Sequence, residues 1–322
     1  MGTPSIEEIR QAAERIRPFA HRTPVFTCKS LNERTQSDIY LKAENLQKVG
    51  AFKFRGACNT VFSLLPEEAE RGVATHSSGN HAQALALAAR LRGIPAYIVM
   101  PRTAPQVKAA GVAGYGGQIT FCEPTLEARE TTLEDVVQRT GATIVHPYND
   151  LRVIAGQGTA ALELMEQVPD LDVVMTPVGG GGLLSGTAIA VSALSPRTRI
   201  IAAEPEGADD AYRSLLAGRI LPSVYPQTIA DGLLTSLGTL TFPIIQELVE
   251  QIVTVSEEAI LSAMRFTWER TKLIIEPSAA VPLAVFWEAK VDLIGLRIGV
   301  ILSGGNVSLD QLPWQIDRPT FS

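Results

Sequence analysis

One lysine of the chain has a setting that suits covalent chemistry. Lys53 lies between Phe52 and Phe54 in the tract 48–56, which also contains two glycines. An apolar setting lowers the pKa of a lysine amine because it disfavours the charged ammonium, and the neutral amine can attack a carbonyl carbon. The tract therefore favours a lysine that forms a Schiff base. The alternative is a lysine whose stem lies along a strand or helix edge with its ammonium in water.

A cluster of polar side chains directly precedes an alanine-rich stretch of helical character. The tract 76–81, His-Ser-Ser-Gly-Asn-His, brings hydroxyl, amide and imidazole groups to the expected N-terminus of a helix over residues 80–92. Such a helix end offers free N–H donors to a carboxylate. The alternative is ordinary N-capping of the helix by Ser78 or Asn80.

Two glycine-rich tracts follow buried apolar runs. Gly179 to Gly182 come after the run 173–178, and four bare backbone amides at a helix start can bind a phosphate. These glycines complete neither a dinucleotide-binding G-x-G-x-x-G motif nor a P-loop. The tract 303–306, Ser-Gly-Gly-Asn, ends the run 298–302, and ligands of open α/β sheets bind at such carboxyl ends. A simple or close-packed glycine turn is the alternative for each tract.

Alternating strands and helices must position these tracts. Ser5 and Glu8 form a capping box for a first helix, whose apolar residues recur at helical spacing until Pro18. Apolar runs without polar alternation are typical of parallel strands that are buried on both faces. Because helical stretches separate these runs, the pattern predicts an α/β protein built of βαβ units. The expected strands cover residues 39–41, 96–100, 119–122, 143–145, 173–178, 200–203 and 298–302, and the expected later helices cover residues 80–92, 125–140, 187–195 and 257–272.

Length and composition bound the class of protein. The 322 residues, 46% of them hydrophobic, suffice for about two domains with a large core. The formal net charge of −6 argues against a nucleic-acid partner. The segment 173–196 is uncharged, but Pro177 and four glycines interrupt it, so we expect no membrane span. Three widely spaced cysteines, and a start at residues 1–10 without an apolar run, predict a cytoplasmic protein.

Taken together, in this order and spacing, the tracts resemble those of the fold-type II pyridoxal-phosphate enzymes. Within them, the chain is most similar to the serine racemase, threo-3-hydroxyaspartate dehydratase and threonine dehydratase group, and above all to the serine racemases. The resemblance implies the α/β fold of the tryptophan synthase β subunit, with two open, mostly parallel sheets and helices on both faces. It also implies a large cofactor-binding domain of residues 1–65 and 151–322 and a small mobile domain of residues 66–150. The supporting tracts are residues 95–100, 146–149, 154–158, 202–205, 228–232 and 276–278.

The resemblance implies a role in cofactor binding for several of these residues. Lys53 would hold pyridoxal 5′-phosphate through a Schiff base and act as a base on one face of the substrate Cα. Asn80 would hydrogen-bond the phenolic oxygen of the cofactor ring, and Ser303 would face the pyridine nitrogen. A hydroxyl cannot protonate that nitrogen as an aspartate could, which favours loss of a β-leaving group over transamination. The phosphate would be bound by Gly179, Gly180, Gly181, Gly182 and Leu183.

The resemblance implies the substrate contacts as well. In the racemases the second serine of the pair, here Ser78, stands on the face of the substrate Cα opposite the lysine. Arg129 is a candidate contact for a second substrate carboxylate, and an ordinary surface arginine of a helix is the alternative. The substrate carboxylate itself would be held by the loop residues Ser77, Ser78, Gly79, Asn80 and His81.

Two acidic residues resemble the divalent-cation site of the same family. Glu204 and Asp210, six residues apart after an expected strand, would bind Mg²⁺ or Ca²⁺ together with the backbone oxygen of Ala208 and waters. Hard oxygen ligands suit these ions, and they suit Mn²⁺ as well. The alternative is a solvated acidic turn in which Asp209 or Asp210 caps the helix that reaches Leu216.

The resemblance also bears on assembly and regulation, and it implies a homodimer. Animal serine racemases carry a neighbouring pair of serines at the ATP site between subunits, and Cys28 and Lys29 replace that pair here, which argues against activation by ATP. Because the chain ends at Ser322, we expect no regulatory domain of the allosteric threonine deaminases. The residues of the ATP site that this chain retains are Lys48, Gln83, Tyr115 and Lys272.

The leading interpretation is a pyridoxal-phosphate-dependent serine racemase that is also a serine dehydratase, converting L-serine to D-serine and to pyruvate plus ammonia. The alternative within the group is a threo-3-hydroxyaspartate or threonine dehydratase, an ammonia-lyase without significant racemisation. A β-replacement enzyme of the cysteine-synthase type is a further alternative, against which the acidic pair and the double serine count. A cofactor-binding protein without catalysis, or a nucleotide-binding module, is the alternative from another class; Lys53, Ser78 and Ser303 together favour an enzyme.

Overall fold

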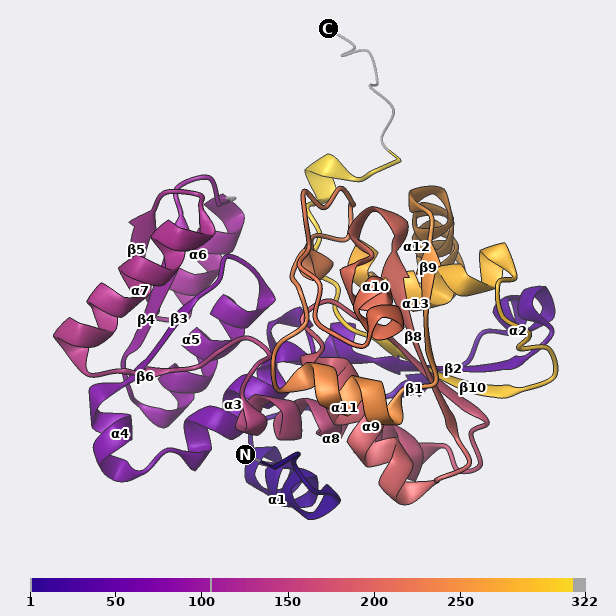
Figure 1. Cartoon of the computed structure of the whole chain (residues 1–322), viewed down its shortest axis with the longest axis horizontal. Helices are drawn as coiled ribbons and strands as arrows, with labels where there is room; N and C mark the ends of the chain where they lie inside the picture. Colours follow the sequence, from indigo (N-terminus) through magenta and orange to yellow (C-terminus); the bar gives the residue numbers. More distant parts are fainter. Residues whose placement is uncertain (1, 105, 315–322) are drawn as a thin grey trace, which may run out of the picture.

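The apolar runs of the sequence form the strands of two separate sheets, in a computed structural model that describes residues 2–104 and 106–314 (Figure 1). The six-stranded sheet has the order β1 (Val25–Phe26), β2 (Asp38–Ala43), β10 (Arg297–Leu302), β7 (Val173–Pro177), β8 (Arg199–Pro205) and β9 (Gln251–Val255). The four-stranded sheet has the order β5 (Gln118–Cys122), β4 (Ala96–Pro101), β3 (Val73–His76) and β6 (Thr143–Ile144). Neighbouring strands are parallel, except that β1 is antiparallel to β2. The expected α/β architecture with two open, mostly parallel sheets is therefore confirmed.

Helices pack on both faces of both sheets, which explains the continuous apolar runs of the strands. The helices are α1 (Ile6–Ile16), α2 (Lys29–Thr35), α3 (Lys53–Ser63), α4 (Pro66–Arg71), α5 (Asn80–Arg92), α6 (Gln106–Gly114), α7 (Leu126–Thr140), α8 (Leu151–Gln167), α9 (Gly182–Leu194), α10 (Asp210–Ala217), α11 (Thr241–Leu248), α12 (Glu257–Thr271) and α13 (Pro277–Glu288). In β7, Met175 packs with α12 and α13, whereas the neighbouring Val174 packs with α8 and α9 on the other face. In β3, Val73 packs with α3 and α5, and Ala74 packs with α7.

The structure corrects parts of the expected series of elements. The apolar pattern does not predict strands β3 and β9 or helices α3, α8 and α13. Strand β3 has only four residues, and α13 contains Pro282 in its interior, which local propensity disfavours. Helix α9 begins at Gly182 and not at Thr187. It begins earlier because Gly181, with φ of +87°, is its N-cap residue and turns the loop after β7 into the helix.

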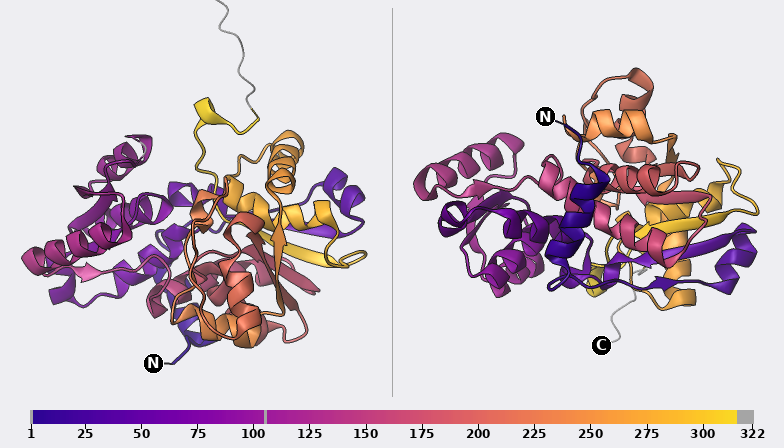
Figure 2. Two further views of the ribbon diagram at one scale, coloured as in Figure 1. Left: turned by 45° about the horizontal axis from the view of Figure 1, so that its top comes forward. Right: turned by 90° about the horizontal axis from the view of Figure 1, so that it is seen from below.

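The four-stranded sheet and its helices lie on one side of the molecule in each view (Figures 1 and 2). All strands of this sheet fall within residues 73–144, and those of the larger sheet fall outside that range. Helix α3 packs against α5 beside the smaller sheet and against α8 beside the larger one. The division into domains 1–65 with 151–322 and 66–150 stays a prediction. None of the helices in residues 2–104 and 106–314 is both long and apolar enough to cross a membrane.

A buried cluster of four charges fixes the start of α3, which carries the candidate lysine. The guanidinium of Arg55 donates to both oxygens of Glu44, at 2.7 and 2.8 Å, and to both oxygens of Glu163, at 2.8 Å each. The Nζ of Lys42 on β2 donates to Glu163 on α8, at 2.6 Å. The two cations and two anions pair fully, and such pairing offsets the cost of removing charges from water. The cluster thereby ties α3 to β2 and α8.

Candidate active site

Lys53 is the first residue of α3, and its amine lies among groups from other elements. Its Nζ donates a hydrogen bond to the carbonyl oxygen of Pro147, at 2.8 Å, and lies 5.1 Å from the centroid of the Phe52 ring. Burial lowers the pKa of Lys53 to about 8, although the nearby carboxylate of Glu276 raises it. A sizeable share of the amine is therefore neutral near physiological pH, as a nucleophile or general base requires.

The four glycines form a buried loop at the N-terminus of α9. No backbone N–H of Gly179 to Gly182 donates a hydrogen bond to another residue in the described part of the chain. A Cβ on Gly180 would lie 2.3 Å from the ring of Tyr148, so no other residue fits there. The loop is thus close-packed and still presents free N–H donors at a helix N-terminus. Both features suit the phosphate of the cofactor, and the residues present fit the group.

Asn80, the first residue of α5, is held from two sides. Its Nδ2 donates to Oε1 of Glu276 at 2.9 Å, and its Oδ1 accepts from Nδ2 of Asn306 at 2.8 Å. Nδ2 of Asn80 also donates to Oε2 of Glu276 at 3.2 Å, so the amide group is held in one orientation at the start of α5. Ser303 is buried at the end of β10, and its carbonyl oxygen accepts from the backbone N–H of Phe52 at 3.0 Å. The structure thus brings the lysine tract, the polar loop and the Ser-Gly-Gly-Asn tract together.

Glu276 is a site residue that the sequence reasoning missed. Its carboxylate also accepts from the backbone N–H of Asn306, at 3.2 Å. Burial raises the pKa of Glu276 to about 7, although the hydrogen bond from Asn80 lowers it. The only signal in the sequence was the tract 276–278, which contributes to the family resemblance but does not show which groups the carboxylate meets.

The loop between β3 and α5 leaves its serine hydroxyls free of capping bonds. Gly79 is the N-cap residue of α5, and its own N–H donates to Oγ of Ser77 at 3.4 Å, but no side chain in the described part of the chain caps the first N–H groups of the helix. The interpretation of Ser78 or Asn80 as an ordinary helix cap is therefore wrong. His81 is buried, and its Nε2 lies 3.1 Å from the carbonyl oxygen of Val145, whereas its Nδ1 has no hydrogen-bond partner in the part of the chain that the structure describes. Burial and the nearby Lys53 lower the pKa of His81 to about 3, so its ring is neutral.

Arg129 lies on α7 beside the smaller sheet and is partly buried. Its Nε is buried and has no hydrogen-bond partner within residues 2–104 and 106–314. Its charge acts on His76, the residue that ends β3 directly before the serine pair, and helps burial to lower the pKa of that histidine. Arg129 therefore lies close enough to His76 for its charge to act on that ring, and it keeps a buried donor.

Glu204 and Asp210 lie side by side in the interior, at the end of β8 and the start of α10. The carboxylate of Glu204 accepts from the backbone N–H groups of Ala211 and Tyr212, at 3.0 and 2.8 Å. Both carboxylate oxygens of Asp210 are buried, and neither has a hydrogen-bond partner among the described residues. Burial raises the pKa of Glu204 to about 8 and that of Asp210 to about 6. The interpretation as a solvated turn capped by Asp209 or Asp210 is wrong. The carboxylates of Glu204 and Asp210 are buried, and Glu204 accepts the hydrogen bonds that cap α10.

This acidic pair fits a divalent cation, because a buried carboxylate without a partner calls for a positive charge. Ala208, whose backbone oxygen is the third expected ligand, is also buried. No three His, Cys, Asp or Glu side chains gather at a metal-binding distance anywhere in the described residues. A cation at Glu204 and Asp210 would therefore depend on backbone oxygens and waters for its remaining ligands.

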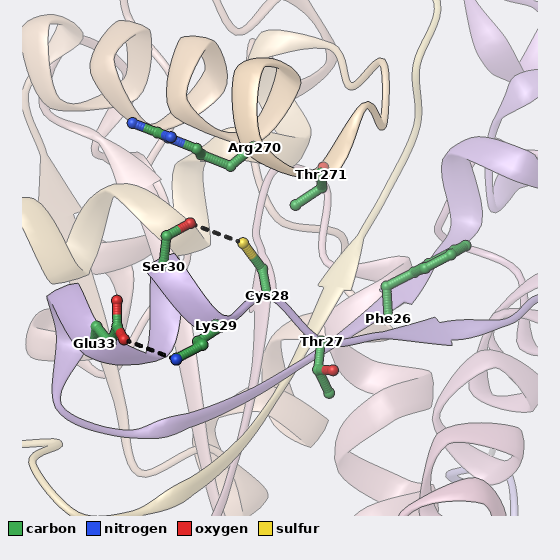
Figure 3. Close-up of a pocket in the computed structure, with 8 residues that line it drawn as sticks. All are labelled: Phe26, Thr27, Cys28, Lys29, Ser30, Glu33, Arg270 and Thr271. Carbon is green, nitrogen blue, oxygen red and sulfur yellow. Dashed lines mark hydrogen bonds and ion pairs between the residues drawn. The ribbon is translucent and has the colours of Figure 1, made fainter.

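A pocket of about 510 Å³ lies beside the two residues that depart from the ATP-binding pattern (Figure 3). Cys28 has its Sγ 3.3 Å from Oγ of Ser30, and the Nζ of Lys29 lies 3.7 Å from Glu33. Thr271, which precedes Lys272, also lines the pocket. The pocket thus presents a carboxylate as well as cations, and a carboxylate is unfavourable next to a polyphosphate.

Comparison with known proteins agrees with this geometry. The family model described as "Pyridoxal-phosphate dependent enzyme" matches residues 16–304. The chain is 53% identical to the beta-hydroxyaspartate dehydratase of Paracoccus denitrificans (strain Pd 1222), over 98% of this chain and 100% of that protein. It is 50% identical to the solved structure of serine racemase from Dictyostelium discoideum, with a TM-score of 0.91 over 96% of this chain and 100% of that one.

The solved structure of a T.th. threonine deaminase is 45% identical, with a TM-score of 0.90 over 95% of this chain and 99% of that one. These similarities extend over nearly the whole length of each chain. They agree with a buried lysine amine, a glycine loop with free backbone N–H groups and a buried serine at one site. The chain therefore belongs to the family of pyridoxal-phosphate-dependent enzymes, in the fold-type II group of racemases and ammonia-lyases.

Proposed function

We propose that the chain is a serine racemase that also dehydrates serine, converting L-serine to D-serine and to pyruvate plus ammonia. The observation that carries this proposal is the meeting of the Lys53 amine with the glycine loop, through Pro147 and Tyr148, beside a loop whose Ser78 caps nothing. The similarity to a serine racemase along nearly the full chain supports it.

Different residues of the chain bind different parts of the cofactor and of the substrate. When bound, pyridoxal phosphate supplies a carbonyl carbon for amines and withdraws electrons from the substrate Cα. The N–H groups of Gly179 to Leu183 would hold its phosphate, the side-chain amide of Asn80 would orient its ring, and Ser303 would face its nitrogen. The substrate carboxylate is held by the loop of Ser77, Ser78, Gly79, Asn80 and His81.

Proton transfer then involves two residues on opposite faces of the substrate Cα. The neutral Lys53 amine takes the α-proton of L-serine. In racemisation the hydroxyl of Ser78 donates a proton to the opposite face and regains one from water, while Lys53 releases the α-proton to water, so no proton is gained or lost overall. In dehydration the proton goes to the departing β-hydroxyl, which leaves as water, and the remaining product hydrolyses to pyruvate and ammonia.

A dehydratase acting on threo-3-hydroxyaspartate or threonine is the second candidate. The unpaired Nε of Arg129 favours a substrate with a second carboxylate, since a buried donor needs an acceptor. The similarity to a beta-hydroxyaspartate dehydratase supports the same interpretation.

We also propose several finer features of the enzyme. We propose that Glu204, Asp210 and the backbone oxygen of Ala208 bind Mg²⁺ or Ca²⁺, with Mn²⁺ as a substitute, and that the ion is structural. We further propose a homodimer without activation by ATP. Three free cysteines, all buried, are in keeping with a cytoplasmic protein, which we also propose.

One experiment tests the function. The purified protein is incubated separately with L-serine, L-threonine and L-threo-3-hydroxyaspartate, while 2-oxoacid formation and the enantiomer composition are followed. We expect D-serine and pyruvate from L-serine. Oxoacid formation from hydroxyaspartate without any D-amino acid would support the dehydratase instead. Borohydride reduction followed by peptide mapping should place the cofactor on Lys53, and a Lys53→Ala protein should lack the yellow colour.

A further inference from the structure

A tight turn between the smaller sheet and α8 is organised by one imidazole. The Nδ1 of His146 accepts from the backbone N–H of Asn149 at 2.9 Å and from that of Tyr148 at 3.3 Å. This is the arrangement of an Asx turn, in which a side-chain acceptor bonds the backbone two or three residues ahead. Burial lowers the pKa of His146 to about 4, so the ring is neutral and Nδ1 is available as an acceptor.

The turn contacts both halves of the proposed cofactor site. The carbonyl oxygen of Pro147 accepts from Nζ of Lys53 at 2.8 Å. The ring of Tyr148 meets the ring of His146 edge-on, with centroids 4.6 Å apart, and packs directly against Gly180 of the phosphate loop. The side chain of Asn149 closes the far end, with Oδ1 accepting from the backbone N–H of Leu240 at 2.8 Å. One four-residue turn therefore touches the lysine and the glycine loop together.

The contact with Pro147 matters for an amine that must accept a proton. A carbonyl oxygen only accepts, so it binds one N–H of Lys53 and leaves the lone pair of the neutral amine pointing elsewhere. A fixed carbonyl thus selects one position of a long, flexible side chain whenever its amine is not bonded to the cofactor.

We infer that His146 is a positioning residue, whose ring holds the turn 146–149 so that Pro147 orients the Lys53 amine and Tyr148 supports the glycine loop. This inference rests on the proposed function, because it takes Lys53 as the cofactor lysine and base. His146 acts through the turn and touches no reacting atom.

The charged and titratable groups that face Lys53 determine the expected effect of losing this contact. The carboxylate of Glu276 raises the pKa of Lys53, whereas His81 and His146 are neutral near pH 7 because burial lowers their pKa values to about 3 and 4. The negative end of the Pro147 carbonyl stabilises the ammonium further. If the carbonyl moves away, burial is less compensated and the pKa of Lys53 falls.

The test compares three variants of one residue type. His146→Leu removes the acceptor, His146→Asn keeps an acceptor that can form the same turn, and His21→Leu changes an exposed histidine as the matched control. In the cofactor-free proteins, the pH dependence of acylation at Lys53, followed by peptide mass mapping, gives the pKa of that amine. The affinity for added pyridoxal phosphate is measured by titration.

We expect His146→Leu to lower the pKa of Lys53 by about one unit and to weaken cofactor binding by about tenfold. His146→Asn and His21→Leu should retain both values. A folded His146→Leu protein with an unchanged pKa and affinity would overturn the inference. Should the leucine variant fail to fold, the His146→Asn protein still tests the inference. A lowered pKa of Lys53 and a weakened affinity for the cofactor in that variant, although it keeps an acceptor, would overturn the inference as well.

Failure of the proposed function gives a different result. If the wild-type protein carried its reduced cofactor on a lysine other than Lys53, the function would be wrong, whatever the titration of Lys53 showed. If the cofactor is on Lys53 but His146→Leu behaves like the wild type, only the role of His146 is wrong.

Discussion

Burial shifts the pKa values of Lys53 and Glu276 in the site more than neighbouring charges do. The pKa of Lys53 is lowered to about 8 and that of Glu276 is raised to about 7, so each is displaced toward its neutral form. The neutral form of the lysine is the reactive one. When Glu276 is neutral, the side-chain amide of Asn80, which is proposed to orient the cofactor, meets a carboxylic acid instead of a carboxylate.

Ser78 separates the two reactions proposed for the enzyme. Ser78→Ala removes the proton donor on the face of Cα opposite Lys53, and we expect it to abolish racemisation and any action on D-serine. Dehydration of L-serine should largely persist, since it needs only Lys53 and protonation of the departing hydroxyl. Both rates are measured on the same protein by enantiomer analysis and pyruvate formation.

The control is Ser77→Ala, which changes the adjacent hydroxyl and should affect the two reactions alike. Because Ser78 does not cap α5, its loss should leave the melting temperature unchanged. Equal losses of both reactions in Ser78→Ala would contradict its role as the proton donor.

Glu276 should make the stability of the cofactor-free protein depend on pH. Its pKa is about 7 in the folded state and near its ordinary value of 4.5 in the unfolded chain, so the folded state binds the proton more tightly. Its contribution therefore lowers the free energy of unfolding as pH rises from about 4.5 to 7, by roughly 3 kcal/mol. Glu276→Gln, which does not titrate, should flatten this dependence. Urea unfolding at pH 5 and pH 8 checks it, and parallel curves for both proteins would refute it.

For the helices and strands, the apolar pattern of the sequence predicts where elements lie along the chain, but it does not predict their tertiary contacts. The run 298–302 predicts β10 within one residue, and the capping box of Ser5 and Glu8 predicts the start of α1. The apolar pattern does not predict strand β3, because four residues are too few for a pattern. This strand nevertheless leads directly into the serine pair of the site. Glu276 and His146 could not be assigned, because their partners Asn80, Asn306, Tyr148 and Asn149 are fixed by tertiary packing or by a turn that no periodicity marks.

The junction of β8 and α10 should depend on a divalent cation. Asp210→Asn removes one of the two buried carboxylates, and we expect it to abolish the rise in melting temperature that Mg²⁺ gives the chelated wild-type protein. Asp209→Asn is the matched control, because that neighbouring carboxylate pairs with Arg213 at 2.7 Å and should leave the response intact. Thermal unfolding with and without Mg²⁺ decides the matter. An Asp210→Asn protein that responds like the wild type would exclude this site.

For the whole molecule, the two sheets meet at a site to which both contribute. The smaller sheet supplies the polar loop after β3 and the turn after β6, and the larger sheet supplies the glycine loop after β7 and Ser303 after β10. All four follow the carboxyl ends of parallel strands, where ligands of α/β proteins bind. The sequence indicates the carboxyl end of single strands, but it does not show that the ends of the two sheets face one another, because that arrangement follows from packing over the full chain.

An ion pair close to Glu276 also joins these two parts of the molecule. The Nζ of Lys108 on α6 donates to Oδ2 of Asp231 at 2.6 Å, and Asp231 begins the short helix 231–233 that packs on the glycine loop. Both side chains are partly exposed, so the pair contributes at most about 1 kcal/mol. If closure of the smaller sheet over the substrate uses this pair, Lys108→Met or Asp231→Asn should raise the KM for L-serine by about two- to fivefold and leave kcat nearly unchanged.

Exchanging the two charges provides the decisive comparison for this pair. Lys108→Asp and Asp231→Lys each place like charges together and should raise the KM more than the neutral variants do. The double exchange restores opposite charges and should bring the KM back toward the wild-type value. Added salt should diminish all of these differences, since the pair is near solvent. Steady-state kinetics at low and high ionic strength measures this, and a double exchange as impaired as the sum of its singles would show that the pair does not hold the two sheets together.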